Sequence, residues 1–155
     1  MASKQLNINF DEGLTKLTIN DDEDRFIYVN LTDYNIITRF EEAQKNINNK
    51  LKEYDDIEIK ADGTANVDTE YATRAIKDIT EYVEAQFDYI FNSDVSKTVF
   101  NGQSCLSSVG GVPLYERFIL AIIPMIEKEA KSEKKQAEKN MKKYKEQAAR
   151  FQKKI

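Results

Sequence analysis

The segment that most restricts how this chain can fold is residues 127–155, whose composition and pattern are those of one exposed basic helix. It holds 11 Lys and Arg against 5 Glu, a net charge of +6. Residues 1–126 hold 12 Lys and Arg against 22 Asp and Glu, a net charge of −10. The sequence therefore predicts an acidic body that carries a basic arm, and such a separation of charge indicates electrostatic contact with a partner.

An apolar seam runs along the basic arm. Its members recur at heptad spacing and are Ala137, Met141, Tyr144, Ala148, Phe151 and Ile155. Glu127, Glu138 and Glu146 each precede a Lys or Arg by four residues, which favours a helix. The seam spans fewer than three heptads and becomes polar at Glu133 and Lys134, so self-association through it is predicted to be weak.

Three interpretations of the basic arm remain open. It is a solvated helix or frayed tail, or a docking segment for a partner protein, or a contact for nucleic acid or an anionic membrane. An apolar seam flanked by lysines suits an acidic groove, which the body of another copy could also provide. Nucleic acid is disfavoured because the acidic body would repel phosphates.

The length of the last helix is the second constraint on the fold. If residues 113–155 formed one helix, it would be about 64 Å long at 1.5 Å per residue. A compact chain of 155 residues has a radius of gyration of only about 15 Å. The end of the chain must therefore protrude or fold back, and Pro124 is predicted to kink or break the helix because it lacks a backbone donor.

Two runs near the N-terminus alternate between apolar and polar residues. The apolar members are Leu6, Ile8 and Phe10 in the first run and Leu17 and Ile19 in the second. A turn at residues 11–13 separates the runs, so the pattern predicts a β-hairpin. Residues 26–29 are rich in β-forming side chains and predict a third strand. We expect a small antiparallel meander within residues 5–30.

Helical periodicity follows the meander. Apolar residues recur at steps of three or four over residues 33–54, and again over residues 68–91, where Asp68 is the predicted N-cap. A third helix is predicted over residues 112–126, with Pro113 in its first turn. Between the first two helices, residues 57–63 predict a short extended excursion that turns at an Asp-Gly pair.

These elements predict an α+β fold. Residues 1–126 form an acidic globular domain in which a small N-terminal antiparallel sheet precedes a helical bundle. Residues 127–155 extend it as a long, partly projecting, basic amphipathic C-terminal helix.

Side chains that could perform catalysis are scarce. The sequence has no histidine, which removes the commonest general base and the commonest transition-metal ligand. The single cysteine, Cys105, has no activating neighbour in sequence and is interpreted as a packed thiol. Glu81, Glu84 and Asp88 are close along one helix and are interpreted as a solvated face. We predict no catalytic residue, no metal site and no cofactor, and therefore no enzyme.

Four stretches of the chain resemble a known family. They are residues 87–91 (FDYIF), 99–102 (VFNG), 106–118 (LSSVGGVPLYERF) and 123–128 (IPMIEK), together with the opening Ile8-Asn9-Phe10. The chain is similar in these motifs, in size and in layout to tail assembly chaperones from the tail-gene clusters of phages and prophages of Gram-positive bacteria. The resemblance implies a non-enzymatic protein that binds the tape-measure protein, keeping it soluble until tail-tube subunits polymerise around it.

The resemblance supplies partners but no residue-level site. The expected partners are the tape-measure protein and the tail-tube protein, with weak homo-oligomerisation possible, and without nucleic acid or membrane. On the charge split and the seam, we predict apolar anchors at Met141, Tyr144, Phe151 and Ile155. Cations that steer an acidic partner are predicted at Lys142, Lys145 and Arg150. The alternatives are an acidic inhibitor of a host defence protein and a structural component of the virion.

The expected location is the cytoplasm of the bacterial host. The longest apolar run, residues 118–126, is far shorter than the roughly 20 residues that a membrane-spanning helix needs. The first residues lack the apolar core of a signal peptide.

Overall fold

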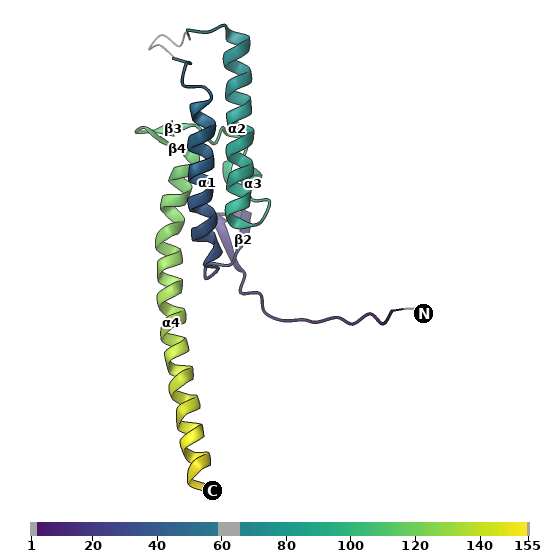
Figure 1. The fold of residues 1–155 in the computed structure, drawn as a ribbon, viewed down its shortest axis with the longest axis vertical. Coiled ribbons are helices and arrows are strands. Elements are labelled where there is room, and N and C mark those ends of the chain that lie inside the picture. Colours follow the sequence, from purple (N-terminus) through teal and green to yellow (C-terminus); the bar gives the residue numbers. More distant parts are fainter. Residues whose placement is uncertain (1–2, 59–65, 155) are drawn as a thin grey trace.

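The computed structural model describes the backbone of residues 3–58 and 66–154, and side chains as far as residue 150. Its elements are two strands, two long helices, a short helix, a second pair of very short strands and one long C-terminal helix (Figure 1). The predicted α+β class is confirmed, including the small N-terminal antiparallel sheet and the long C-terminal helix. Most of the excursion predicted at residues 57–63 lies outside the described residues.

The N-terminal sheet is a two-stranded hairpin. β1 (Thr15–Ile19) pairs antiparallel with β2 (Asp22–Val29), with Thr15 opposite Val29. The two loop residues, Asn20 and Asp21, have φ values of 51° and 61°. Asn and Asp tolerate this left-handed conformation, which matches the twist of a tight hairpin.

The prediction that residues 6–10 form the first strand of a meander is wrong. Residues 3–14 are extended but belong to no strand, and in Figure 1 they lead away from the body. The side chain of Asn30 donates to the carbonyl of Glu12 at 3.1 Å, and the amide of Gly13 donates to the carboxylate of Asp11 at 2.8 Å. The bond from Asn30 holds Glu12 beside the end of β2, and the bond from Gly13 to Asp11 closes a local turn, so the chain does not turn back along β1.

Two antiparallel helices form the centre of the body. α1 covers Asn35–Lys52, where residues 33–54 were expected, and α2 covers Thr69–Phe91, where residues 68–91 were expected. The carboxylate of Asp68 accepts from the amide of Tyr71 at 2.7 Å, as an N-cap does. Asn92 ends α2 in the left-handed conformation that often closes a helix.

A compact connection joins α2 to the last helix. α3 (Ser96–Phe100) is followed by β3 (Ser108–Val109) and β4 (Val112–Pro113), which pair with each other. Gly110 and Gly111 make the turn at φ values of 59° and 81°, where other residues would be strained.

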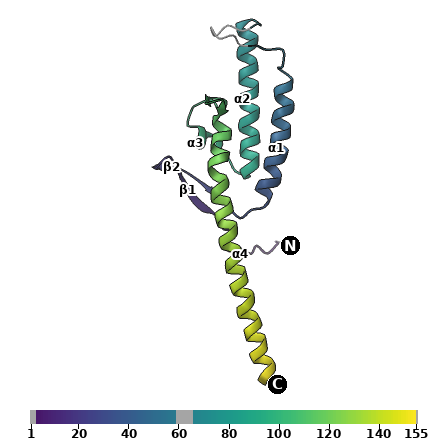
Figure 2. The same cartoon turned by 90° about the vertical axis from the view of Figure 1, so that its left-hand side faces the viewer.

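The last helix is continuous. α4 covers Leu114–Lys154, a run of 41 residues that contains Pro124 without ending there. At 1.5 Å per residue it is about 62 Å long. Its first part lies beside the other elements, and the rest continues past the body (Figure 2). The boundary that we placed between residues 126 and 127 therefore falls inside one helix.

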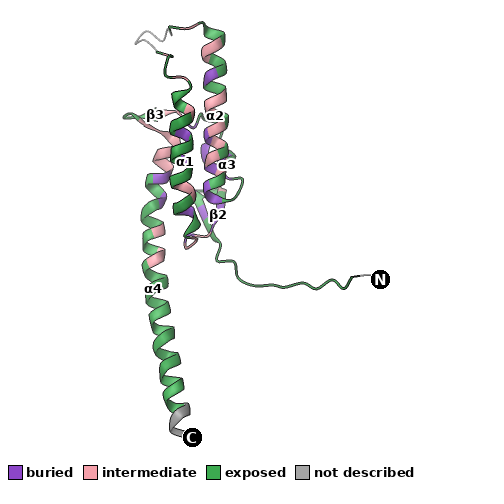
Figure 3. Cartoon of the chain, in the orientation of Figure 1, coloured by how far each residue is buried: buried purple, intermediate pink, exposed green. Residues whose placement is uncertain are grey.

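The core is where α1, α2, α3, the start of α4 and the hairpin meet (Figure 3). The ring of Phe87, which is fully buried, lies 5.1 Å from Phe91, 4.7 Å from Phe100 and 5.3 Å from Phe118 between centroids. The hairpin adds the buried side chains of Leu17, Ile19, Ile27 and Val29. This cluster fixes the start of α4 and so sets the direction in which the helix leaves the body.

Candidate protein-binding surface

The described side chains in the second half of α4 are exposed. Every residue from 131 to 150 is exposed, as the unbroken green of Figure 3 shows. The exposed fractions of Met141 and Tyr144, the two large apolar side chains of this part, are 59% and 67%. Of the other predicted anchors, the side chain of Phe151 and all of Ile155 lie outside the described residues. We use "the seam" below for Ala137, Met141, Tyr144 and Ala148.

The seam continues an apolar stripe that begins inside the body. An α-helix turns by about 100° per residue, so residues on one stripe can be identified from their numbers. The apolar side chains within about 60° of one direction include those of Ile119, Ile123, Ile126, Ala130, Ala137, Met141, Tyr144 and Ala148, and Glu133 and Lys134 interrupt them in the same sector. Since α4 is unbroken, the two halves of this stripe remain in phase. The surface therefore starts on the body and extends along the arm.

On the body, the stripe borders an apolar groove. The groove lies between α1, α2 and α4 and has a volume of about 230 Å³. Its apolar lining residues are Ile36, Ile37, Phe40, Ile90, Phe91, Ile119, Ile122, Ile123 and Ile126. Ile37 is 53% exposed and Ile123 is 37% exposed, although burying such apolar side chains normally stabilises a protein. We call this surface the α1–α4 groove.

Sequence reasoning did not find the α1–α4 groove. Ile119 and Ile122, which line the groove, are also buried in the core. One signal was available: Ile36 and Ile37 are consecutive on a helix, so their side chains point about 100° apart and cannot both be buried in one core. Ile36 faces the core, so Ile37 was bound to face outward.

A second hollow connects the groove to the seam. Tyr34, which is exposed at the start of α1, lies beside Ala130, Lys131, Glu133, Lys134 and Ala137 of α4. α4 extends past this end of α1 (Figure 1). The α1–α4 groove, the hollow beside Tyr34 and the seam thus follow one another along the same side of α4, and we call the three together the α4 face.

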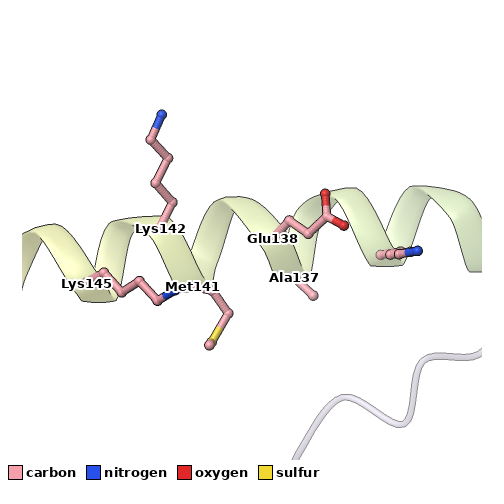
Figure 4. A pocket seen from close by; sticks show the side chains of 6 residues that line it. Ala137, Glu138, Met141, Lys142 and Lys145 are labelled. Carbon is pink, nitrogen blue, oxygen red and sulfur yellow. The ribbon is translucent and has the colours of Figure 1, made fainter.

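The predicted cations take different positions around the helix. Figure 4 shows the side chains of Ala137 and Met141 on one side of α4 and that of Lys142 on the opposite side. Lys134, Lys142 and Lys145 line a shallow surface hollow on α4 together with Ala137 and Met141 of the seam. The side chain of Lys142 points away from that of Met141, whereas Lys145 lies at the edge of the seam.

Among the side chains that the structure describes, the charges of the basic arm form no ion pair. The ion pairs among the described residues join Arg39 to Asp33, and Lys50 to both Glu53 and Asp78. None of the described side chains of residues 127–150 comes within 4 Å of an opposite charge, so the predicted pairs four residues apart are not formed. The arm retains a positive field that can attract an acidic partner.

Other candidate sites have structural explanations. Cys105 is fully buried, and burial raises the pKa of its thiol to about 12, so it is not a nucleophile at neutral pH. The interpretation of Asp88 as solvated is wrong, because it accepts hydrogen bonds from the amides of Val95 and Ser96 at 2.9 and 2.7 Å. Burial, and then the neighbouring Asp88, raise the pKa of Glu84. Within residues 3–58 and 66–154, no cluster of carboxylates and sulfur could hold a metal ion.

Comparison with family models, with curated proteins and with solved structures gives no match. In the part of the chain that the structure describes, the helices include none with the length and apolar character needed to cross a lipid bilayer.

Proposed function

We propose that this protein is a non-enzymatic chaperone of phage tail assembly that holds a segment of the tape-measure or tail-tube protein on its α4 face. The observation that supports the proposal is the row of apolar side chains from Ile123 to Ala148, interrupted at Glu133 and Lys134, which lies on a helix whose exposed end carries a net positive charge. Exposed contiguous apolar surface flanked by charge is typical of protein-interaction sites.

The shape of the α4 face favours a helical partner. The seam lies where α4 extends past α1, so a partner helix could occupy beside the arm the position that α1 occupies beside the body. Met141 and Tyr144 would insert between the partner's side chains, while Ala137 and Ala148 would allow a close approach. Acidic residues on the partner would meet Lys134 and Lys145 at the edge of the seam.

Reversible binding is consistent with the composition of the seam. Two of its four described residues are alanine, which contribute little apolar area. Affinity would therefore depend on few anchors and on charge, and a competing tail subunit could displace the chaperone. Such a role belongs in the cytoplasm of the bacterial host.

Co-expression tests the proposal. The full chain and a chain ending at Ala130 are each expressed with the tape-measure and tail-tube proteins and then isolated. The full chain should retain the tape-measure protein, and the shortened chain should lose it while unfolding at the same temperature, since no exposed residue from 131 to 150 supports the core. Equal retention by both chains would refute the role of the arm. Recovery of the full chain in purified virions would instead favour a structural component.

A further inference from the structure

Residues 5–10 have the pattern of a strand but lack a partner. Leu6, Ile8 and Phe10 are 78%, 80% and 73% exposed, and polar residues alternate with them. Among the described residues, no backbone hydrogen bond joins residues 3–14 to a strand. Three large apolar side chains are thus held in water on an extended segment, which is unfavourable unless another surface covers them. We call residues 5–10 the N-terminal arm.

The hairpin has a free edge that could accept such a strand. β2 is flanked on one side by β1 and contacts α3, whose carbonyls bind the side chain of Arg25. β1 pairs only with β2 within the described part of the chain. The outer edge of β1 therefore presents unpaired amides and carbonyls, as edge strands do.

An apolar groove lies along this free edge. Leu17, Thr18 and Ile19 of β1 and Asn20 of the adjoining turn line one side, and α4 contributes Phe118, Ala121, Ile122 and Met125. The groove has a volume of about 150 Å³ and separates β1 from α4. A strand added to β1 would point alternate side chains into it, on the same face as the buried Leu17 and Ile19. We call it the β1–α4 groove.

The N-terminal arm and the β1–α4 groove match each other. Six extended residues span about 20 Å and the five residues of β1 about 16 Å, so the arm can pair along the whole strand. Its period-two pattern places all three apolar side chains toward α4 and both asparagines toward solvent. Each copy of the chain therefore carries a donor strand and an acceptor groove.

We propose that the N-terminal arm of one copy adds as a third strand to β1 of a second copy, covering the β1–α4 groove. Pairing within one chain is disfavoured because residues 11–13 are held at the end of β2 by the bond from Asn30 to Glu12. Turning the arm back over the far edge of β1 would break this bond. Strand addition of this kind supplies main-chain hydrogen bonds and specific pockets together.

Two variants test the donor strand and the acceptor groove separately. A chain lacking residues 3–10 keeps the groove and loses the arm. Ala121→Arg keeps the arm and fills the groove, and because Ala121 is exposed the core is spared. Ala121→Ser is the matched control, and circular dichroism establishes that all variants are folded. Sedimentation velocity over a concentration series then measures self-association.

The wild type and Ala121→Ser should self-associate, and each of the two test variants should do so at least about tenfold more weakly, because three apolar contacts are lost. Mixed in equal amounts, the two variants should form a complex of one chain of each kind, since one supplies the arm and the other the groove. A wild type that stays monomeric, or an arm deletion without effect, or a mixture that stays monomeric, would each overturn the proposal.

Discussion

The carboxylate of Asp88 closes the turn between α2 and α3. It accepts from the amides of Val95 and Ser96 and also from the hydroxyl of Ser96, at 2.9 Å. Both residues are buried, so their amides have no water to replace this acceptor. The side chain therefore determines where α3 begins, and α3 supplies Phe100 to the core.

Asp88→Ala should lower the free energy of unfolding by about 2 to 3 kcal/mol, because two buried amides lose a charged acceptor. Glu81→Ala, on the exposed side of the same helix, is the matched control and should change it by less than about 0.5 kcal/mol. Urea titration followed by circular dichroism measures both. Equal effects of the two substitutions would show that Asp88 does not organise this turn.

The buried thiol of Cys105 gives a pH-dependent prediction. Its pKa is raised from 9.0 to about 12, so the folded state retains the proton over a range in which the unfolded state loses it. The unfolded state then binds fewer protons, and stability falls as the pH rises from about 9 to about 12. Cys105→Ala should reduce this fall, measured as the midpoint of urea unfolding between pH 8 and pH 11. A decline just as steep in the variant would contradict the assignment.

At the scale of elements, Arg25 connects the hairpin to the helices. Its Nε atom donates to the carbonyl of Thr98 at 2.8 Å, and its Nη2 atom donates to the carbonyl of Val99. These carbonyls lie in the last turn of α3, where helix geometry leaves acceptors without partners. The guanidinium thus satisfies the end of α3 and fixes β2 against it.

Arg25→Lys should destabilise the protein by about 1 to 2 kcal/mol, because an ammonium group cannot donate to two carbonyls in the fixed geometry of a guanidinium. Arg74→Lys, at an exposed position of α2, is the control and should leave the unfolding temperature unchanged. Differential scanning calorimetry measures the unfolding temperature of both variants. Unfolding at the wild-type temperature in Arg25→Lys would mean that the hairpin is held by its apolar face alone.

Elements with strong periodicity could be predicted from the sequence, and those that depend on distant contacts could not. The apolar stripes of α1 and α2 and the cap at Asp68 are local signals. The position of residues 6–10 is not, because an alternating strand reveals its faces but not its partner. The direction of the N-terminal arm depends on a hydrogen bond from Asn30, and that bond forms only once β2 is in place. The seam was visible in the sequence, whereas its continuity with the α1–α4 groove required α4 to be unbroken at Pro124.

At the scale of the whole molecule, charge is divided between an acidic body and a basic projecting helix. The cations of the basic C-terminal arm lie beyond the body, where they meet an approaching acidic partner first. Long-range attraction of this kind raises the rate of association more than it slows dissociation. It is also weakened by salt, since the screening length is about 10 Å at 0.1 M.

Replacing Lys142, Lys145 and Arg150 by glutamine should slow association with the tape-measure partner about three- to tenfold at low salt and leave dissociation nearly unchanged. Replacing Lys45, Lys52 and Lys77 of the body by glutamine makes the same change in net charge and is the matched control. Surface plasmon resonance at several salt concentrations measures both rates. If the two triple variants behaved alike, net charge rather than the arm would account for the attraction.

The most direct test of the central claim, that the seam binds a partner protein, is a comparison of opposite sides of α4. Calorimetric titration measures the affinity of two double variants, Met141→Ala/Tyr144→Ala and Lys139→Ala/Glu146→Ala, for the tape-measure partner. Lys139 and Glu146 lie on the opposite side of α4 from the seam, and their charges cancel, so the second variant is the matched control. The account predicts at least about tenfold weaker binding for the first pair, from the apolar contact it removes, and wild-type affinity for the second. Wild-type affinity in the first pair, or equal losses in both, would contradict it.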